Sequence, residues 1–515
     1  MKALRELIDI VTKHKKKQME VIGLDKDSPN RYDEFYDLLV TEQLPTDQDA
    51  AQYFFGQDKS ASFTQYRNFR NKFFRRLVNA VFLLDVKKPM FSEVQTAMYN
   101  CKKSTAAARI LALKGAKWAA FEVAEKTIKH AIMYESFYEI LDLARIIRTK
   151  YVFYKPDIEK QLEYEALISK TLLDLELILK AERIYYELLS PYTLSKSSKP
   201  EIAAKAGNYL EELKADLPKS DAYFFRYLYY VIAKLACTTR HDYRGSMKVC
   251  KEAIADLKKR KAATPPAIAT FLQPLIVAAT MLGQYEKAEA AAAQLEGLNL
   301  PGSHNWYKGM EVLVFFRLHQ QNYQEAYRVF KQARNHKRFS HLSAANQEQW
   351  YLFEAYVHLL IAMGKIKRSE AEEKRLKLRP ARLLNQVPLF SKDKRGLNIP
   401  ILIVHAIYLL HLRRYEEAYD RMQALEKYAG RHLKATDDNF RSYCFIKALS
   451  KIPDSDYNPE AAQQAAADLL REMGQHSLQF ADTPHEVENM PYEHLWALAM
   501  EALGALSRLK QRISC

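Results

Sequence analysis

The amino-acid sequence predicts an all-α protein, and two observations carry that prediction. Glycine is scarce: the chain has 14 glycines in 515 residues, whereas average usage near 7% would place about 36 in a chain of this length. Phosphate-binding loops, tight hairpins and Rossmann turns consume glycine because only glycine adopts positive φ without steric cost. A motif with helical spacing also recurs from about residue 220 onward. Together these observations argue against α/β enzymes, β-sandwiches and β-barrels.

Size and charge leave several kinds of binding partner open. A length of 515 residues corresponds to about three to four domains, or to one long repeat array. With 48% hydrophobic and 27% charged residues, the chain can bury a core. The net charge of +16 fits an acidic partner such as nucleic acid, anionic lipid or an acidic protein surface. The alternative is that the excess charge only keeps a large helical protein in solution.

The N-terminal residues and the cysteines predict a cytoplasmic protein that does not enter a membrane. The first residues carry charges every few positions, so no signal peptide is expected. Residues 262–285 and 399–412 are free of charge, but prolines interrupt the first stretch and the second is too short to span a bilayer, so we expect buried helices there. The dispersed cysteines form no CxxC pair and predict neither disulfide bonds nor a zinc site: Cys101, Cys237, Cys250, Cys444 and Cys515.

The recurring motif opens on one of four tyrosines, Tyr243, Tyr285, Tyr323 and Tyr415. A small residue follows three positions later, and further small or apolar residues follow after seven and ten positions. The residues at the first of these positions are Ser246, Ala288, Ala326 and Ala418. This spacing places all the positions on one face of a helix. We therefore predict that each tyrosine closes a turn between antiparallel helices, and that the small residue lets the two backbones approach.

The motif resembles the second helix of the tetratricopeptide repeat, which opens with G-x-Y-x-x-A and continues to an aromatic residue and an alanine. The opening is matched by Gly283, Tyr285 and Ala288, and most of the helix by Tyr323, Ala326, Phe330 and Ala333. The tyrosines are 42 (243 to 285), 38 (285 to 323) and 92 (323 to 415) residues apart, against about 34 in the family. The longest step has room for a degenerate unit around Gly364. The first-helix tryptophan and the closing proline of the family are mostly missing.

The resemblance implies a right-handed α-solenoid of antiparallel helix pairs over residues 101–515, without carrying over the family's peptide-binding groove. A degenerate unit is also expected at Phe137, with Ile140, Ala144 and Ile147 on its inner face. Pro191 and residues 195–200 are expected to mark a loop. No stretch is long or biased enough to be a flexible linker, which favours one continuous array.

Residues 1–100 differ in character and are predicted to form an N-terminal helical module. Helices are expected over residues 3–21, 31–43 and 47–55, the third capped by Thr46 and ended by Gly56. A fourth helix is expected over residues 63–84, with Ser62 as its N-cap. Its core-facing residues recur at steps of three and four: Tyr66, Phe69, Phe73, Leu77, Val81 and Leu84.

The fourth helix is the first candidate binding site, because its other faces carry basic and amide side chains. These are Arg67, Asn68, Arg70, Asn71, Lys72, Arg75 and Arg76. A helix, a turn with glycine and a basic helix together resemble the helix-turn-helix DNA reader, whose second helix enters the major groove. Arg and Asn make bidentate contacts with guanine and adenine edges. The resemblance implies nucleic-acid binding through residues 63–84; the alternative is a solvated basic face on a capping helical bundle.

A second basic run covers residues 365–395, and its polar loop offers a candidate site for an acidic partner at Lys392, Lys394 and Arg395. A solvated charged helix and loop is the alternative. The sequence holds no HExxH, GxSxG or GxxxxGK[ST] motif and no paired-carboxylate motif. His405 and His411 are six residues apart and do not share a helix face cleanly. The sequence therefore predicts no catalytic residue, no metal and no cofactor.

The sequence thus favours a non-enzymatic adaptor or scaffold that binds another macromolecule, in the first place a protein, through its solenoid surface. The alternative is a nucleic-acid-binding regulator that uses residues 63–84, with the repeats sensing a partner or a signal. An enzyme hidden in a helical cleft is a third class, which a cluster of perturbed titratable groups in one deep pocket would reveal.

Overall fold

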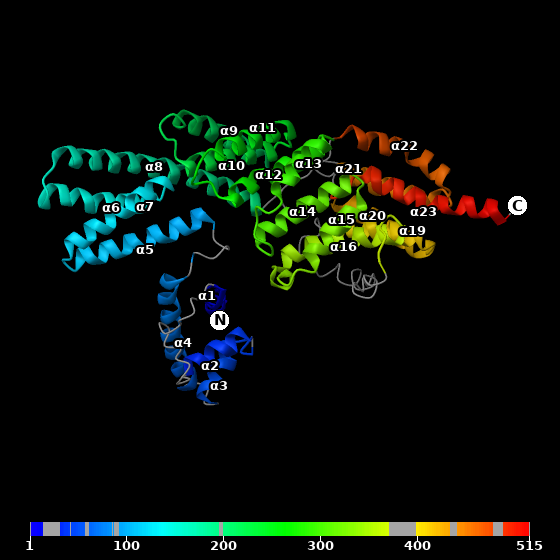
Figure 1. The fold of residues 1–515 in the computed structure, drawn as a ribbon. Coiled ribbons are helices and arrows are strands. Elements are labelled where there is room, and N and C mark those ends of the chain that lie inside the picture. Colours follow the sequence, from blue (N-terminus) through cyan, green and yellow to red (C-terminus); the bar gives the residue numbers. More distant parts are fainter. Residues whose placement is uncertain are drawn as a thin grey trace. The chain divides into compact units, whose positions relative to one another are not determined.

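The structure of the chain is a computed structural model that describes residues 2–13, 31–41, 43–56, 61–84, 86, 92–194, 199–369, 398–432, 440–476 and 488–513. Within these ranges the chain is helical and contains no β-strand (Figure 1). The all-α class predicted from the scarcity of glycine is therefore confirmed. Among the described helices, none combines the length and the apolar character that crossing a bilayer requires.

The chain divides into two compact units, Met1–Leu175 and Glu176–Cys515. The helices of the first unit are α1 (Lys2–Lys13), α2 (Arg31–Val40), α3 (Asp47–Phe55), α4 (Ala61–Ala80), α5 (Glu93–Leu113), α6 (Lys117–Met133) and α7 (Phe137–Thr149). A short 3-10 turn, Val81–Leu83, follows α4, and a π-helical segment, Lys150–Tyr154, follows α7. Helix α8 (Ile158–Leu194) begins in the first unit and continues into the second.

The first four helices enclose a core of their own around Phe35 on α2. The ring of Phe35 lies 5.5 Å from the ring of Phe54 on α3 and 5.1 Å from that of Phe73 on α4. Local sequence explains the bounds of α3, as predicted: Thr46 forms a capping box with the third helical residue, and Gly56 ends the helix with φ of +86°. The sequence therefore marks both ends of α3, which contributes Phe54 to this core.

Helix α4 has bounds that differ from the predicted 63–84. It begins at Ala61, and Val81–Leu83 tightens into a 3-10 turn before Leu84 becomes extended. Tyr66, Phe73 and Leu77 are buried, as their spacing predicts, whereas Phe69, Val81 and Leu84 are only partly buried. The helical period cannot place the last two because the helix has ended before them.

The second unit contains a longer succession of helices. They are α9 (Lys199–Asp216), α10 (Tyr223–Thr238), α11 (Tyr243–Leu257), α12 (Pro265–Met281), α13 (Tyr285–Leu295), α14 (His304–His319), α15 (Tyr323–Arg334), α16 (Ala344–Ala362), α19 (Asn398–His411), α20 (Tyr415–His432), α21 (Phe440–Asp454), α22 (Pro459–Gln475) and α23 (Tyr492–Ile513).

Most of these helices pack against their neighbours in sequence, such as α10 against α11, α12 against α13, α14 against α15 and α21 against α22. Three contacts depart from this order: α12 packs against α14, α14 against α16, and α23 against α19 as well as against α22. The C-terminal part of the second unit is therefore more than a plain succession of helix pairs. Handedness and a regular solenoid remain predictions.

The prediction that Pro191 marks a loop is wrong. Pro191 lies inside α8, which continues to Leu194. A proline in a helix removes one backbone hydrogen bond and kinks the chain. Close to the end of a 37-residue helix, that loss does not stop the last turn.

Candidate functional site

The four motif tyrosines are each the first residue of a helix: α11, α13, α15 and α20 begin at Tyr243, Tyr285, Tyr323 and Tyr415. The residue two positions before each tyrosine has positive φ, with +54° at His241, +67° at Gly283, +59° at Gln321 and +61° at Arg413. The next N–H then bonds to a carbonyl five residues earlier, as from Gln284 to Ala279 at 2.8 Å and from Asn322 to Arg317 at 3.0 Å. A left-handed residue followed by a hydrogen bond that spans five residues is the Schellman motif, which ends a helix.

The same turn recurs outside the four motifs. Gly115, at φ of +84°, precedes α6, and Glu135, at +54°, precedes α7, which begins at Phe137. Gly364, at +69°, follows α16. One turn geometry therefore ends helices in both units, although its left-handed position is glycine in only some cases.

The small residues of the motifs lie at the helix contacts. Ala288, Ala326 and Ala418 have no exposed surface, and Ser246 is 5% exposed. The positions seven and ten residues after each tyrosine are also buried: Cys250, Ala253, Ala292, Leu295, Phe330, Ala333, Met422 and Leu425. A methyl group at the closest approach lets two helix backbones come together, and larger residues then fill the space beyond.

The tyrosine rings are half-buried in related but not identical settings. The hydroxyl of Tyr285 donates to the carbonyl of His319 at 3.3 Å. The ring of Tyr415 packs at a tilt against that of Tyr457 with centroids 4.4 Å apart, and Tyr457 donates to the carbonyl of Tyr415 at 3.0 Å. Burial raises the pKa of Tyr323 to about 12. All four tyrosines are thus half-buried at the start of their helices.

The structure sorts the seven predicted nucleic-acid-binding residues of α4 into two groups. Five are exposed and form no hydrogen bond or ion pair with any described residue: Arg67, Asn68, Asn71, Lys72 and Arg75. They share one face, opposite the buried Tyr66 and Phe73, because helical positions repeat every 3.6 residues. We name these five residues the α4 polar face.

The other two predicted residues contact the N-terminal core. Arg70 forms an ion pair with Asp47 on α3 at 3.1 Å, and the guanidinium of Arg76 lies 4.4 Å from the ring centroid of Tyr32 on α2. Tyr66 also donates to Asp47, at 2.6 Å. Arg70 and Arg76 lie at the two edges of the buried face, so their long side chains fold onto the neighbouring helices. The candidate acidic-partner residues Lys392, Lys394 and Arg395 lie outside the described residues.

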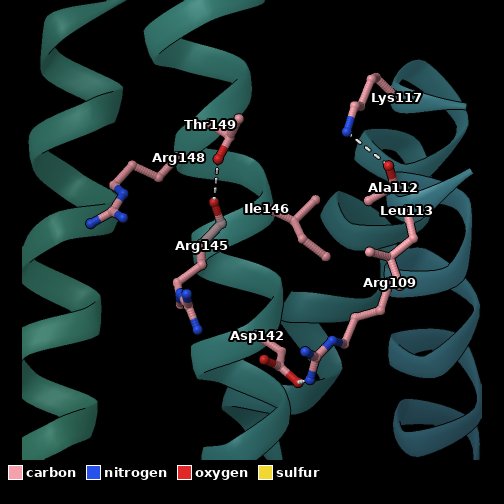
Figure 2. A pocket seen from close by; sticks show the side chains of 9 residues that line it. All are labelled: Arg109, Ala112, Leu113, Lys117, Asp142, Arg145, Ile146, Arg148 and Thr149. Atoms are coloured by element: carbon pink, nitrogen blue, oxygen red, sulfur yellow. Dashed lines mark hydrogen bonds and ion pairs between the residues drawn. The ribbon is translucent and has the colours of Figure 1, made fainter. Parts of the chain in front are cut away.

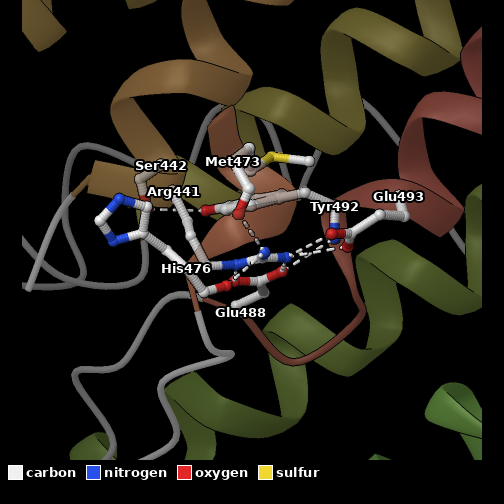
Figure 3. Close-up of polar contacts among 7 residues, drawn as sticks. All are labelled: Arg441, Ser442, Met473, His476, Glu488, Tyr492 and Glu493. Carbon is white, nitrogen blue, oxygen red and sulfur yellow. Dashed lines mark hydrogen bonds and ion pairs between the residues drawn. The ribbon is translucent and has the colours of Figure 1, made fainter. Parts of the chain in front are cut away.

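A buried ion-pair network that the sequence did not predict holds the C-terminal helix (Figure 3). The guanidinium of Arg441, on α21, donates to both oxygens of Glu488 at 2.9 and 2.7 Å and to those of Glu493 at 2.9 and 2.8 Å. It also donates to the carbonyls of Met473 and His476. Only 8% of the Arg441 side chain and 6% of the Glu488 side chain are exposed. Every donor here is engaged, which suits a structural role.

A pocket of about 330 Å³ lies between α5 and α7 in the first unit (Figure 2). Its lining comprises Arg109, Ala112, Leu113, Lys117, Asp142, Arg145, Ile146, Arg148 and Thr149. Arg109 reaches across from α5 to Asp142 on α7 at 2.8 Å. Lys117 donates to the carbonyl of Ala112 at 2.7 Å, near the end of α5. The sequence did not reveal this pocket, because its cations come from three helices, α5, α6 and α7, and Arg109 is 36 residues from Arg145 (109 to 145).

The described residues contain no group of three or more His, Cys, Asp or Glu side chains that could hold a metal ion. Comparisons of the chain with known protein families, with curated proteins and with solved structures find no match. Inferences about function therefore rest on the residues themselves.

Proposed function

We propose that this chain is a helical-repeat binding protein, related in design to tetratricopeptide-repeat adaptors, that recognises another macromolecule through the surface of its helix pairs. The observation that carries the proposal is the recurrence of one construction. At each of four motifs a left-handed residue, a helix-opening tyrosine and a buried small residue follow in the same order. Repeated pairs of this kind leave a broad surface whose side chains are free to serve recognition.

Large apolar side chains on the helix pairs support a binding role. Leu113 is 85% exposed, Tyr138 62% and Trp118 61%. Scattered exposed apolar residues are ordinary, but several large ones on one succession of helices are typical of interaction surfaces.

The proposal predicts that the tagged full-length chain, purified from nuclease-treated lysate of its natural host, retains a protein partner at a constant ratio. Replacing exposed side chains one at a time, by Trp118→Ser, Tyr138→Ser and Tyr186→Ser, should release this partner in at least one variant. Quantitative mass spectrometry measures the ratio. A chain that retains no protein in constant ratio contradicts the proposal.

A second candidate function, nucleic-acid binding, is favoured by the α4 polar face. Its three cations and two amides are exposed on one side of a 20-residue helix and have no partner among the described residues. A helix presenting Arg and Asn in this way can enter a major groove or follow a phosphate backbone. Under this candidate the helix pairs would receive the partner or signal that regulates binding.

If this second function holds, the triple variant Arg67→Gln, Lys72→Gln and Arg75→Gln should lose most of its affinity for duplex DNA or RNA. Three phosphate contacts fewer should also flatten the slope of log K against log salt by about 3. Fluorescence anisotropy at several salt concentrations measures both effects. As a control, Lys126→Gln and Lys129→Gln change exposed lysines on α6. Equal affinities for the triple variant, the control and the unaltered chain would exclude this face.

A further inference from the structure

The pocket between α5 and α7 has more positive charge than its own acids neutralise. Four cations line it, Arg109, Lys117, Arg145 and Arg148. Asp142 pairs with Arg109 at 2.8 Å, and Glu165 on α8 pairs with Arg148 at 2.5 Å. Two positive charges therefore remain (4 − 2 = 2).

Arg145 is the cation best placed to accept a new partner. It lies one helical turn beyond Asp142 on α7, and its side chain forms no hydrogen bond or ion pair with the described residues. The backbone carbonyl of Arg145 is occupied by the hydroxyl of Thr149 at 2.9 Å, but the guanidinium keeps its donors for a ligand. An arginine fork matches the two oxygens of a carboxylate.

Exposed apolar side chains adjoin the basic pocket. Leu113 lines the pocket itself and is 85% exposed, and Trp118, 61% exposed, directly follows the lining residue Lys117. The Trp118 ring lies 6.1 Å from that of Tyr154, which belongs to the π-helical segment. Phe153 on the same segment is 75% exposed. π-Helical turns are rare, and they occur frequently at functional sites.

We propose that this pocket and its aromatic rim form a docking site for an acidic segment of a partner protein that alternates carboxylates with large apolar side chains. We call it the α5–α7 site. A carboxylate of the segment bonds to Arg145, with Lys117 nearby, and neighbouring apolar side chains cover Leu113 and Trp118. The inference rests on the proposed function, because it names the chemistry of the partner that the helix pairs recognise.

Charge and shape favour a peptide over a nucleic acid. Only two cations of the pocket, Lys117 and Arg145, have no acidic partner among the described residues, which is few for a continuous phosphate backbone. One anionic group between apolar neighbours matches the site better than a row of phosphates does.

The cations line a pocket and do not form a flat patch, which disfavours a lipid surface. A pocket of about 330 Å³ is at the lower end of the volumes that hold small ligands. A side chain can enter it, whereas lipid headgroups in a bilayer lie in a plane. An acidic peptide therefore uses both the pocket and its rim.

The test uses the full chain and a short fluorescein-labelled peptide in which Glu alternates with Leu and Phe. We expect saturable binding by anisotropy, weakened by about tenfold or more in Arg145→Glu, which corresponds to losing one charge-assisted contact. Lys129→Glu makes the same kind of charge change on an exposed part of α6 and should alter affinity by less than about twofold. A peptide with Lys in place of Glu should not bind.

Tryptophan fluorescence provides a second readout. Trp118 is exposed, whereas two of the other tryptophans, Trp350 and Trp496, are 0% and 5% exposed, and Trp306 is half-buried. The acidic peptide should therefore protect mainly Trp118 from acrylamide quenching. Trp118→Phe should remove most of that protection.

The outcomes separate this proposal from the one on which it rests. Binding that Arg145→Glu leaves unchanged, no binding of the acidic peptide, or Arg145-dependent binding only of oligonucleotides or anionic vesicles would each overturn the α5–α7 site. If the chain nevertheless retains a protein partner from nuclease-treated lysate, the helical-repeat proposal stands without it. If the chain neither binds the acidic peptide nor retains a protein partner, both the α5–α7 site and the helical-repeat proposal are overturned.

Discussion

Arg441→Met should lower the free energy of unfolding of the second unit by about 3–5 kcal/mol, the range seen when one partner of a buried ion pair is removed. The variant leaves Glu488, whose side chain is 6% exposed, without its cation. The variant also removes the donor that bonds to the carbonyls of Met473 and His476. Because Arg441 joins α21 to the segment that leads into α23, the loss should loosen the C-terminal helix first.

Chemical denaturation followed by tryptophan fluorescence measures this effect in a Trp118→Phe background, since the remaining tryptophans all lie in the second unit. Arg471→Met is the matched control. Arg471 bonds to Asp468 at 2.6 Å with 70% of its side chain exposed. Arg471→Met should therefore lower the free energy of unfolding by less than about 1 kcal/mol. Adding Glu488→Gln to Arg441→Met should recover part of the loss, because the buried charge is then removed as well. Equal stabilities for Arg441→Met and Arg471→Met would show that the network does not hold the helix.

Lowering the pH below about 6.5 should destabilise the second unit through His319. Burial lowers the pKa of this histidine to about 3, and His494 and Arg441 add to the effect. The folded state keeps His319 neutral while the unfolded chain takes up a proton, so stability is complete above the unfolded pKa of 6.5 and declines as the pH falls toward about 3. One such group costs about 2 kcal/mol at pH 5.

His319→Gln should remove about one proton from the uptake that accompanies unfolding between pH 7 and pH 5. A residual dependence of the same sign should persist, because burial also lowers the pKa of His358 and of His405 to about 4. His341→Gln is the control, since His341 is exposed. Denaturation curves at several pH values provide the slopes. Identical slopes for His319→Gln and the unaltered chain would mean that the pKa of His319 is the same in the folded and the unfolded chain.

Local chemistry explains which parts of the fold were predictable. The bounds of α3 follow from Thr46 and Gly56, whose effects act within one helical turn. The starts of α11, α13, α15 and α20 coincide with the motif tyrosines for the same reason. The rule that proline ends a helix gave a wrong prediction at Pro191, which lies within α8.

The sequence predicted part of the α4 surface and none of the α5–α7 site. The α4 polar face could be predicted as one side of a helix, because period alone separates Arg67 and Arg75 from Tyr66 and Phe73. The contacts of Arg70 with Asp47 and of Arg76 with Tyr32 could not, since they depend on how α2 and α3 lie against α4. The α5–α7 site was invisible because no spacing rule connects Arg109 with Arg145.

By itself the sequence determined the helical class, many helix boundaries and which face of each motif helix is buried, because these depend on residues within a few turns of one another. Tertiary structure alone decided that α23 returns to α19, that Arg441 pairs with Glu488 across 47 residues, and that the cations of α5 and α7 line one pocket. The physical reason is that ion pairs and pockets form between side chains brought together by packing, and the order of residues along the chain does not encode those distances.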